Sequence, residues 1–158
     1  MKNVLLKIVV VYSDKAAGQL GSRLTETLRR TLGDDFRVAQ SVWRTELLKS
    51  DGLRKVAAEE ARESDLIIVA TSSGGHLPEE VESWFRLWKD RKRRVPGALV
   101  ALVHQERGLP TGHITGELRQ WARRARMEFF CHASGAAKPR PPRRRIASRV
   151  NRELAFAQ

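Results

Sequence analysis

The sequence predicts an α/β domain in which a five-stranded parallel sheet, in strand order 2-1-3-4-5, lies between two layers of helices. Three continuously apolar runs suit strands that are buried on both faces, at residues 4–11, 66–70 and 98–103. Two other runs alternate apolar with polar residues, as half-exposed edge strands do, at 36–43 and 127–132. Helical patterns separate all five runs, which is the order that right-handed βαβ units produce.

The first two helices are predicted from capping residues and apolar spacing. Ser13 or Asp14 can cap the first helix, and Gly33 is expected to end it. A loop over 44–50 precedes the second helix, which is expected at about 51–62. The second helix is expected to bury one apolar face, made of Leu53, Val56, Ala57 and Ala61.

The third and fourth helices carry three of the tryptophans. Pro78 opens the third helix, whose buried face is expected to contain Leu77, Val81, Trp84, Phe85 and Trp88. The fourth helix is expected at about 115–126, with a buried face of Leu118, Trp121, Ala122 and Ala125. Trp84 and Trp88 are predicted to pack between helix and sheet, because a base-stacking platform would need them exposed beside basic residues.

A basic tail is predicted to follow the folded domain. The 158 residues suit one domain at 1–133, followed by a Pro/Arg-rich tail at 134–158. The chain has a net charge of +12, and residues 138–158 supply half of it with seven basic residues and one acidic residue. The tail could bind an acidic protein, or nucleic acid nonspecifically, and the alternative is a disordered extension without a partner. The residues expected to make such contacts are Arg143, Arg144, Arg145 and Arg149.

Cysteine content and hydropathy bear on the compartment. Cys131 is the only cysteine, so the chain forms no internal disulfide and a reducing compartment is the simpler interpretation. No apolar run approaches the roughly 20 residues that a membrane-spanning helix needs. The first residues also lack the pattern of a signal peptide. We therefore expect a cytoplasmic protein without membrane insertion.

Three loops are the predicted place for a ligand. In an open parallel sheet, ligands bind at the carboxyl ends of the strands where the strand order reverses, here between the first and third strands. The loops at 12–18, 71–77 and 104–113 meet there, and the middle loop has small residues that let backbone N–H groups approach an anion. The structural alternative is that its glycines only form a turn. The candidate cofactor-binding residues are Ser13, Asp14, Ser72, Ser73, Gly74, Gly75, His76 and Gln105.

No catalytic or metal-binding motif is recognisable. Residues 70–74 partly imitate the nucleophile elbow of hydrolases, with Ser72 as the exposed serine, but the leading glycine is missing. The histidines and the cysteine do not occur at the paired short spacings of metal sites, so each is expected to be a structural side chain. We therefore predict no catalytic residue and no metal ligand, and Cys131 is expected to pack as a small apolar residue.

The segment 71–85 resembles the third strand and following helix of the flavodoxin-like superfamily. Small residues lead to Gly74-Gly75 and then to a helix of P-x-x-V-x-x-x-F type. The resemblance covers about 4–132 and implies a site for FMN. The superfamily's phosphate loop is similar to S/T-x-T-G-x-T, whereas residues 13–18 keep only the first hydroxyl and have a displaced glycine. Asp14 would repel a phosphate, and the other two loops offer no Trp or Tyr to stack on a flavin.

Two other resemblances bear on the prediction. Residues 43–48 and 72–88 are similar to small uncharacterised bacterial proteins with flavodoxin-like sequences, which implies no activity. Phosphoacceptor receiver domains share the strand order, but their acidic pair, acceptor Asp and Lys are replaced here by Ser13-Asp14, Thr71 and His132-Ala133. A receiver-like module that is independent of phosphorylation stays open as an alternative.

The sequence therefore favours a non-catalytic binding or regulatory module with a basic tail for an acidic partner. No cofactor is expected in that case. The alternative is an FMN-binding flavodoxin-like redox protein or an NAD(P)H-dependent FMN reductase, for which FMN would be the cofactor. The main reason for preferring a binding module is that no loop region combines a nucleophile, a base and an orienting group.

Overall fold

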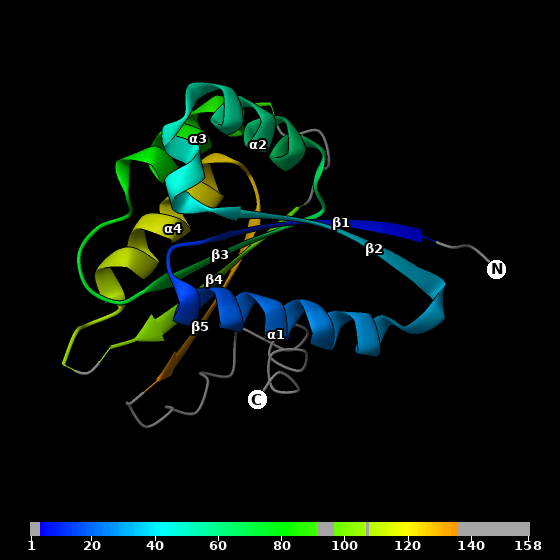
Figure 1. Cartoon of the computed structure of the whole chain (residues 1–158), viewed down its shortest axis with the longest axis horizontal. Coiled ribbons are helices and arrows are strands. Elements are labelled where there is room, and N and C mark those ends of the chain that lie inside the picture. Colours follow the sequence, from blue (N-terminus) through cyan, green and yellow to red (C-terminus); the bar gives the residue numbers. More distant parts are fainter. Residues whose placement is uncertain (1–3, 92–96, 107, 136–158) are drawn as a thin grey trace.

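The five predicted strands form one sheet. The computed structural model describes residues 4–91, 97–106 and 108–135 (Figure 1). All strand pairs are parallel, and the order is β2-β1-β3-β4-β5, as predicted. The strands are β1 (Val4–Tyr12), β2 (Phe36–Arg44), β3 (Leu66–Ser72), β4 (Ala98–Gln105) and β5 (Glu128–Gly135). The strands β1, β3 and β4 are central, so both of their faces must be covered.

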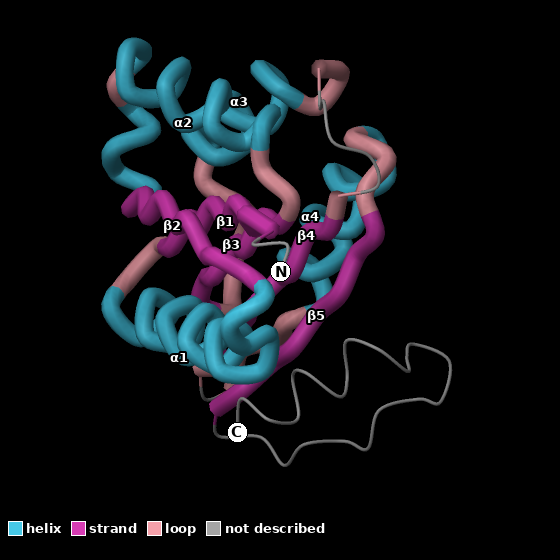
Figure 2. The backbone as a smooth tube through the Cα atoms, turned by 90° about the vertical axis from the view of Figure 1, so that its right-hand side faces the viewer, coloured by secondary structure: helices cyan, strands magenta, loops and turns pink. Residues whose placement is uncertain are grey.

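Helices cover both faces of the sheet and make three layers (Figure 2). One face is covered by α1 (Lys15–Leu32). The other face is covered by α2 (Asp51–Glu63), α3 (Glu79–Trp88) and α4 (Gly112–Arg124). Two 3-10 helices, η1 (Gly33–Asp35) and η2 (Thr45–Lys49), flank β2. Within the described ranges, no helix is both long and apolar enough to cross a membrane.

The central strands divide the core into two clusters. Val9 and Val11 of β1 face the layer of α2, α3 and α4, whereas Ile8 and Val10 face α1. All four side chains are at most 2% exposed. Burial of apolar surface stabilises the fold by about 25 cal/mol per Å², so an apolar residue contributes on either face of such a strand. Residues 8–11 of β1 are all apolar because helices cover both faces of this strand.

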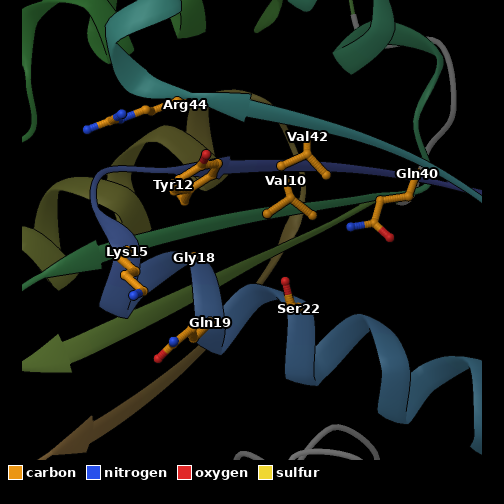
Figure 3. A pocket seen from close by; sticks show the side chains of 9 residues that line it. All are labelled: Val10, Tyr12, Lys15, Gly18, Gln19, Ser22, Gln40, Val42 and Arg44. Atoms are coloured by element: carbon orange, nitrogen blue, oxygen red, sulfur yellow. The ribbon is translucent and has the colours of Figure 1, made fainter.

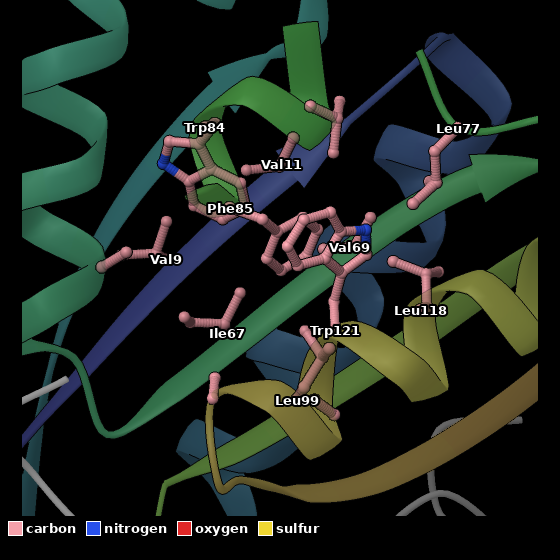
Figure 4. Close-up of a cluster of buried hydrophobic side chains, with 14 of the residues drawn as sticks. Val9, Val11, Ile67, Val69, Leu77, Trp84, Phe85, Leu99, Leu118 and Trp121 are labelled. Carbon is pink, nitrogen blue, oxygen red and sulfur yellow. The ribbon is translucent and has the colours of Figure 1, made fainter. Parts of the chain in front are cut away.

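An aromatic cluster fills the larger core (Figure 4). The rings of Phe85 and Trp121 are stacked, with centroids 5.1 Å apart and an interplanar angle of 6°. Trp84 and Trp88 pack edge to face at 5.3 Å. Both tryptophans of α3 are fully buried. Their predicted role in packing the helix against the sheet is confirmed.

Both ends of α1 follow the predicted signals. Asp14 is the N-cap residue, and its side chain accepts a hydrogen bond from the N–H of Ala17. Gly33 is the C-cap residue with a φ of 68°, which glycine adopts without the steric cost that a Cβ would bring. Its N–H donates to the carbonyl oxygen of Arg29. The helix is therefore bounded by local chemistry at both ends.

The buried face of α2 differs from the prediction. Leu53 is 40% exposed and Val56 is 51% exposed, whereas three alanines are buried, namely Ala57, Ala58 and Ala61. The segment predicted as a loop at 44–50 contains η2, whose Leu48 is fully buried in the same core cluster as these alanines. Arg54 also points toward η2, because its Nη1 donates to the carbonyl oxygen of Leu48 at 2.9 Å. Leu48 of η2 thus supplies a large apolar side chain to this cluster, whereas Leu53 and Val56 of α2 are exposed.

Two element boundaries near the ligand edge also differ. The fourth helix begins at Gly112 rather than near residue 115, because the N–H and the hydroxyl of Thr115 both bond to the carbonyl oxygen of Thr111. The last strand continues to Gly135 rather than ending at His132, since its final residue is paired with Gln105 of β4.

The neighbours Leu47 and Leu48 test the packing of η2. Leu48 is fully buried and Leu47 is 44% exposed. We expect Leu48→Ala to lower the free energy of unfolding by about 2–5 kcal/mol, because it leaves a cavity in the core. Leu47→Ala should change it by less than about 1 kcal/mol. Urea denaturation of both variants measures the difference, and equal losses would contradict the burial of Leu48.

Candidate functional site

The three candidate loops lie at one edge of the sheet because β1, β3 and β4 are parallel. Backbone hydrogen bonds join these loops to their neighbours. The N–H of Ser13 donates to the carbonyl oxygen of Ala70 at 3.1 Å, and the N–H of Ser73 donates to that of His104 at 2.9 Å. Ser73 is buried, and its Oγ accepts from the N–H of Glu106 at 2.7 Å. The edge is therefore a connected unit rather than three independent loops.

Asp14 is bonded on both carboxylate oxygens. Its Oδ1 accepts from the N–H of Ala17 at 2.9 Å, and its Oδ2 accepts from the hydroxyl of Ser72 at 2.6 Å. Partial burial raises the pKa of Asp14, but these hydrogen bonds and the nearby His104 outweigh it and hold the pKa below its ordinary value of 3.8. A negative charge is thus fixed at the amino terminus of α1, where the helix dipole favours one.

The loop after β3 makes a turn that needs glycine. Gly74 and Gly75 have φ angles of 93° and 77°, which L side chains rarely adopt. A Cβ at Gly74 would lie 2.8 Å from the Cδ1 of Leu109. The loops after β3 and β4 therefore touch at this point. These features support the alternative that the glycines form a turn.

The turn places His76 against α4, away from Asp14. The Nδ1 of His76 lies 2.8 Å from the Oε1 of Glu117 and 2.7 Å from the Nε2 of His113. The Oε2 of Glu117 accepts a hydrogen bond from the N–H of Leu77 at 3.0 Å. Sequence spacing did not predict this cluster, because His76 is far along the chain from the other two. The spacing of His113 and Glu117 on one helix face was the only available signal.

A groove opens on the other side of the edge, between α1 and the strands β1 and β2 (Figure 3). Its volume is about 400 Å³, within the range of small-molecule sites. Its lining residues are Val10, Tyr12, Lys15, Gly18, Gln19, Ser22, Gln40, Val42 and Arg44. Lys15 and Arg44 lie at the same end as Tyr12 in Figure 3, and no acidic residue belongs to the lining. The sequence did not predict this groove.

Tyr12 and Gly18 shape one wall of the groove. A Cβ at Gly18 would lie 2.9 Å from the Cδ2 of Tyr12, so the tyrosine ring rests directly on the first turns of α1. Val42, on the edge strand β2, is 52% exposed. The groove therefore exists because α1 covers β1 but leaves the end of β2 open.

Cys131 and His132 lie on β5, outside the candidate loops. Burial raises the pKa of the Cys131 thiol and outweighs the contact with the hydroxyl of Thr115 at 3.7 Å and the charge of Arg119, which both lower it. Burial lowers the pKa of His132. The thiol is therefore protonated at neutral pH, which disfavours a nucleophilic role for Cys131.

The predicted site residues thus separate into distinct environments. The structure brings Asp14, Ser72 and Ser73 into the bonded edge, and it brings His76 to α4. The Oγ of Ser13 is buried without a hydrogen-bond partner among the described residues, and Gln105 is half-buried at the end of β4. The four predicted tail contacts, Arg143, Arg144, Arg145 and Arg149, lie outside the described residues.

Comparison with known proteins identifies the fold. Neither a scan against models of protein families nor a search of curated protein sequences finds a match. Among solved structures, a flavodoxin of Streptococcus pneumonia TIGR4 is similar over 98% of this chain and 95% of its own, with a TM-score of 0.54 and 18% identity. A short-chain flavodoxin associated with a non-canonical PDU bacterial microcompartment is similar over 96% of this chain and 94% of its own, with a TM-score of 0.59 and 13% identity. An oxidoreductase of Corynebacterium diphtheriae is similar over 80% of this chain and 81% of its own, with a TM-score of 0.62 and 11% identity.

These similarities, together with the strand order, establish a flavodoxin-like fold. FMN, the cofactor that a flavodoxin-like fold implies, would need a place for its phosphate at the end of β1, at the amino terminus of α1. The carboxylate of Asp14 already accepts from the N–H of Ala17 and from the hydroxyl of Ser72. A phosphate at these donors would face a fixed negative charge. The residues present therefore do not fit a phosphate at the amino terminus of α1.

Substitution of Asp14 tests its structural role. We expect Asp14→Ala to lower the free energy of unfolding at pH 7 by about 1–2 kcal/mol, because the cap is lost. Asp14→Asn should cost less, since its amide oxygen can still accept from the N–H of Ala17. The pKa of Asp14 is lower in the folded protein than its ordinary value of 3.8, so its charge stabilises the fold above that pH. This stabilisation disappears as the pH falls through the lower, folded-state pKa.

Urea denaturation of the wild type, Asp14→Ala and Asp14→Asn at pH 7 and at a pH well below 3.8 makes the measurement. The gap between the wild type and Asp14→Asn should shrink at the lower pH. A gap that is independent of pH would contradict a charged cap.

Proposed function

We propose that this chain is a non-catalytic binding module with a flavodoxin-like fold, in which Asp14 takes the place that a cofactor phosphate would need. The observation that carries the proposal is the double bonding of this carboxylate, to the N–H of Ala17 at 2.9 Å and to the hydroxyl of Ser72 at 2.6 Å. A helix amino terminus is the usual place for a phosphate in such a fold. Here the carboxylate of Asp14, a part of the chain itself, accepts a hydrogen bond from the N–H of Ala17 at this helix terminus.

The groove beside α1 is the favoured place for a small ligand in this proposal. Lys15 and Arg44 supply the charges of its lining, and Gln19, Ser22 and Gln40 supply uncharged polar groups. An exposed Val42 and the ring of Tyr12 offer apolar contact. A small organic molecule with an acidic group matches this combination, because cations recognise the acid while apolar surface holds the rest.

The tail extends the proposal to a macromolecular partner. Residues 138–158 contain seven basic residues and one acidic residue, which favours an acidic protein or nonspecific nucleic acid as the partner. The tail belongs to the proposal on composition alone. A cytoplasmic location is also proposed, and the single cysteine supports it.

A flavin-dependent redox protein is the second candidate. The similarity of the whole fold to flavodoxins favours this candidate. An NAD(P)H-dependent FMN reductase belongs to the same class. When bound, FMN would supply electron transfer. Asp14 disfavours this candidate, because its charge would oppose the phosphate at the end of β1.

FMN binding separates the two candidates. We expect the purified chain to lose added FMN on desalting, with no flavin absorbance left in the protein fraction. We expect Asp14→Thr to bind FMN at least several-fold more tightly than the wild type, because a hydroxyl replaces the repelling charge. Fluorescence quenching of FMN measures both affinities.

Asp34→Thr is the matched control for the change of charge. Asp34 is exposed in η1, at the opposite end of α1, so this variant should bind FMN as the wild type does. Retention of flavin by the wild type would reverse our preference and favour the redox candidate. Equal FMN affinity of Asp14→Thr and the wild type would show that Asp14 is not what excludes the phosphate.

Removal of residues 138–158 tests the tail. We expect the full chain to bind a polyanion such as heparin or duplex DNA, with an affinity that falls steeply between about 50 and 200 mM salt. The truncated chain should bind at least tenfold more weakly, since half of the net charge is gone. Fluorescence anisotropy with labelled DNA measures this, and circular dichroism checks the fold. Unchanged binding would assign the interaction to the folded domain.

A further inference from the structure

Three possible metal ligands converge between the loop after β3 and the start of α4. They are the Nδ1 of His76, the Nε2 of His113 and the Oε1 of Glu117, which all lie within 4.8 Å of one another. The individual separations are 2.7 Å between the two nitrogens and 2.8 Å from each nitrogen to the carboxylate oxygen. Two elements that are distant in sequence therefore aim three electron-pair donors at one point.

The backbone explains why these side chains meet. His113 and Glu117 are four residues apart in α4, so they share one face of the helix. His76 reaches that face because the positive φ angles of Gly74 and Gly75 turn the loop toward α4. The two imidazole rings stand edge to face, with centroids 4.3 Å apart.

The two facing nitrogens cannot both carry a proton without opposing N–H groups at 2.7 Å. At least one of them therefore directs a lone pair into the cluster.

We propose that His76, His113 and Glu117 bind one divalent transition-metal ion of the Zn²⁺ class. Two imidazole nitrogens and one carboxylate oxygen form a set of ligands used by zinc sites that keep a fourth position open for water. Imidazole also selects against Mg²⁺ and Ca²⁺, which prefer sites made wholly of oxygen. The proposal does not depend on the function proposed above.

The cluster needs only a small adjustment to take the ion. Ligand atoms bonded to tetrahedral zinc at about 2.0–2.1 Å stand roughly 3.3 Å apart, so the present separations of 2.7 and 2.8 Å must open by about half an ångström. The side chains of His76 and His113 are 74% and 58% exposed, which leaves both free to move outward. The same exposure leaves the open position facing solvent.

Glu117 already has the support that metal ligands usually have. Its second oxygen, Oε2, accepts the N–H of Leu77 at 3.0 Å, which orients the carboxylate and leaves Oε1 for the ion. Leu77 is buried in the core cluster, so this donor is held in place by packing. Glu117 is therefore held in place, while the two histidines supply the movement.

Titration of the full chain, without a histidine tag, with Zn²⁺ tests the proposal. We expect one ion per chain by isothermal titration calorimetry, and Co²⁺ should give the visible absorption of a four-coordinate site. His76→Ala, His113→Ala and Glu117→Gln should each weaken Zn²⁺ binding at least about tenfold, since each removes or neutralises one ligand. Zn²⁺ should also raise the melting temperature of the wild type but not that of the variants.

His104→Ala and Glu106→Gln are the matched controls, because His104 lies at the end of β4, Glu106 follows that strand, and neither belongs to the cluster. Both should bind Zn²⁺ as the wild type does. Circular dichroism without metal establishes that every variant is folded. Absence of one-to-one binding by the wild type, or equal binding by the wild type and the three ligand variants, would overturn the proposal and leave the cluster as a hydrogen-bonded link between loop and helix.

Discussion

The parallel pairing of β1 with β3 is the constraint on which the rest of the molecule depends. It makes β1 a central strand, so Ile8 and Val10 need α1 on one face while Val9 and Val11 need the other three helices on the opposite face. Parallel strands also end at the same edge, which brings the loops after β1, β3 and β4 together. Core packing and the position of the candidate site therefore have the same origin.

At that edge the polar groups mainly satisfy one another. Asp14 holds Ser72 and the start of α1, and Ser73 holds the loop after β4 through the N–H of Glu106. Two places face solvent instead, namely the groove beside Tyr12 and the cluster around His76. The chain thus keeps the loop arrangement of a flavodoxin-like fold. Its solvent-facing polar groups lie in the groove and in the cluster, outside the hydrogen-bonded part of the edge.

Residue patterns predicted the sheet well because burial of both strand faces leaves a direct mark on the sequence. They failed where packing between distant segments decides the outcome. Leu53 and Val56 have helical spacing, yet they are exposed, and the core cluster contains Leu48 of η2 beside the alanines of α2. Likewise, Asp14 and Ser72 could be assigned to one edge but not to one another, and the approach of His76 to Glu117 depends on a turn whose direction the letters do not specify.

The internal bonding of Asp14 also bears on how stability responds to the surroundings of the protein. A fold that leaves a helix terminus for a bound anion gains stability in proportion to the logarithm of ligand concentration. Here the counter-charge is part of the chain, at 2.9 Å from the N–H of Ala17. The charge that opposes the helix dipole at this end of α1 is therefore built into the chain, so its contribution does not vary with the concentration of an anion in solution.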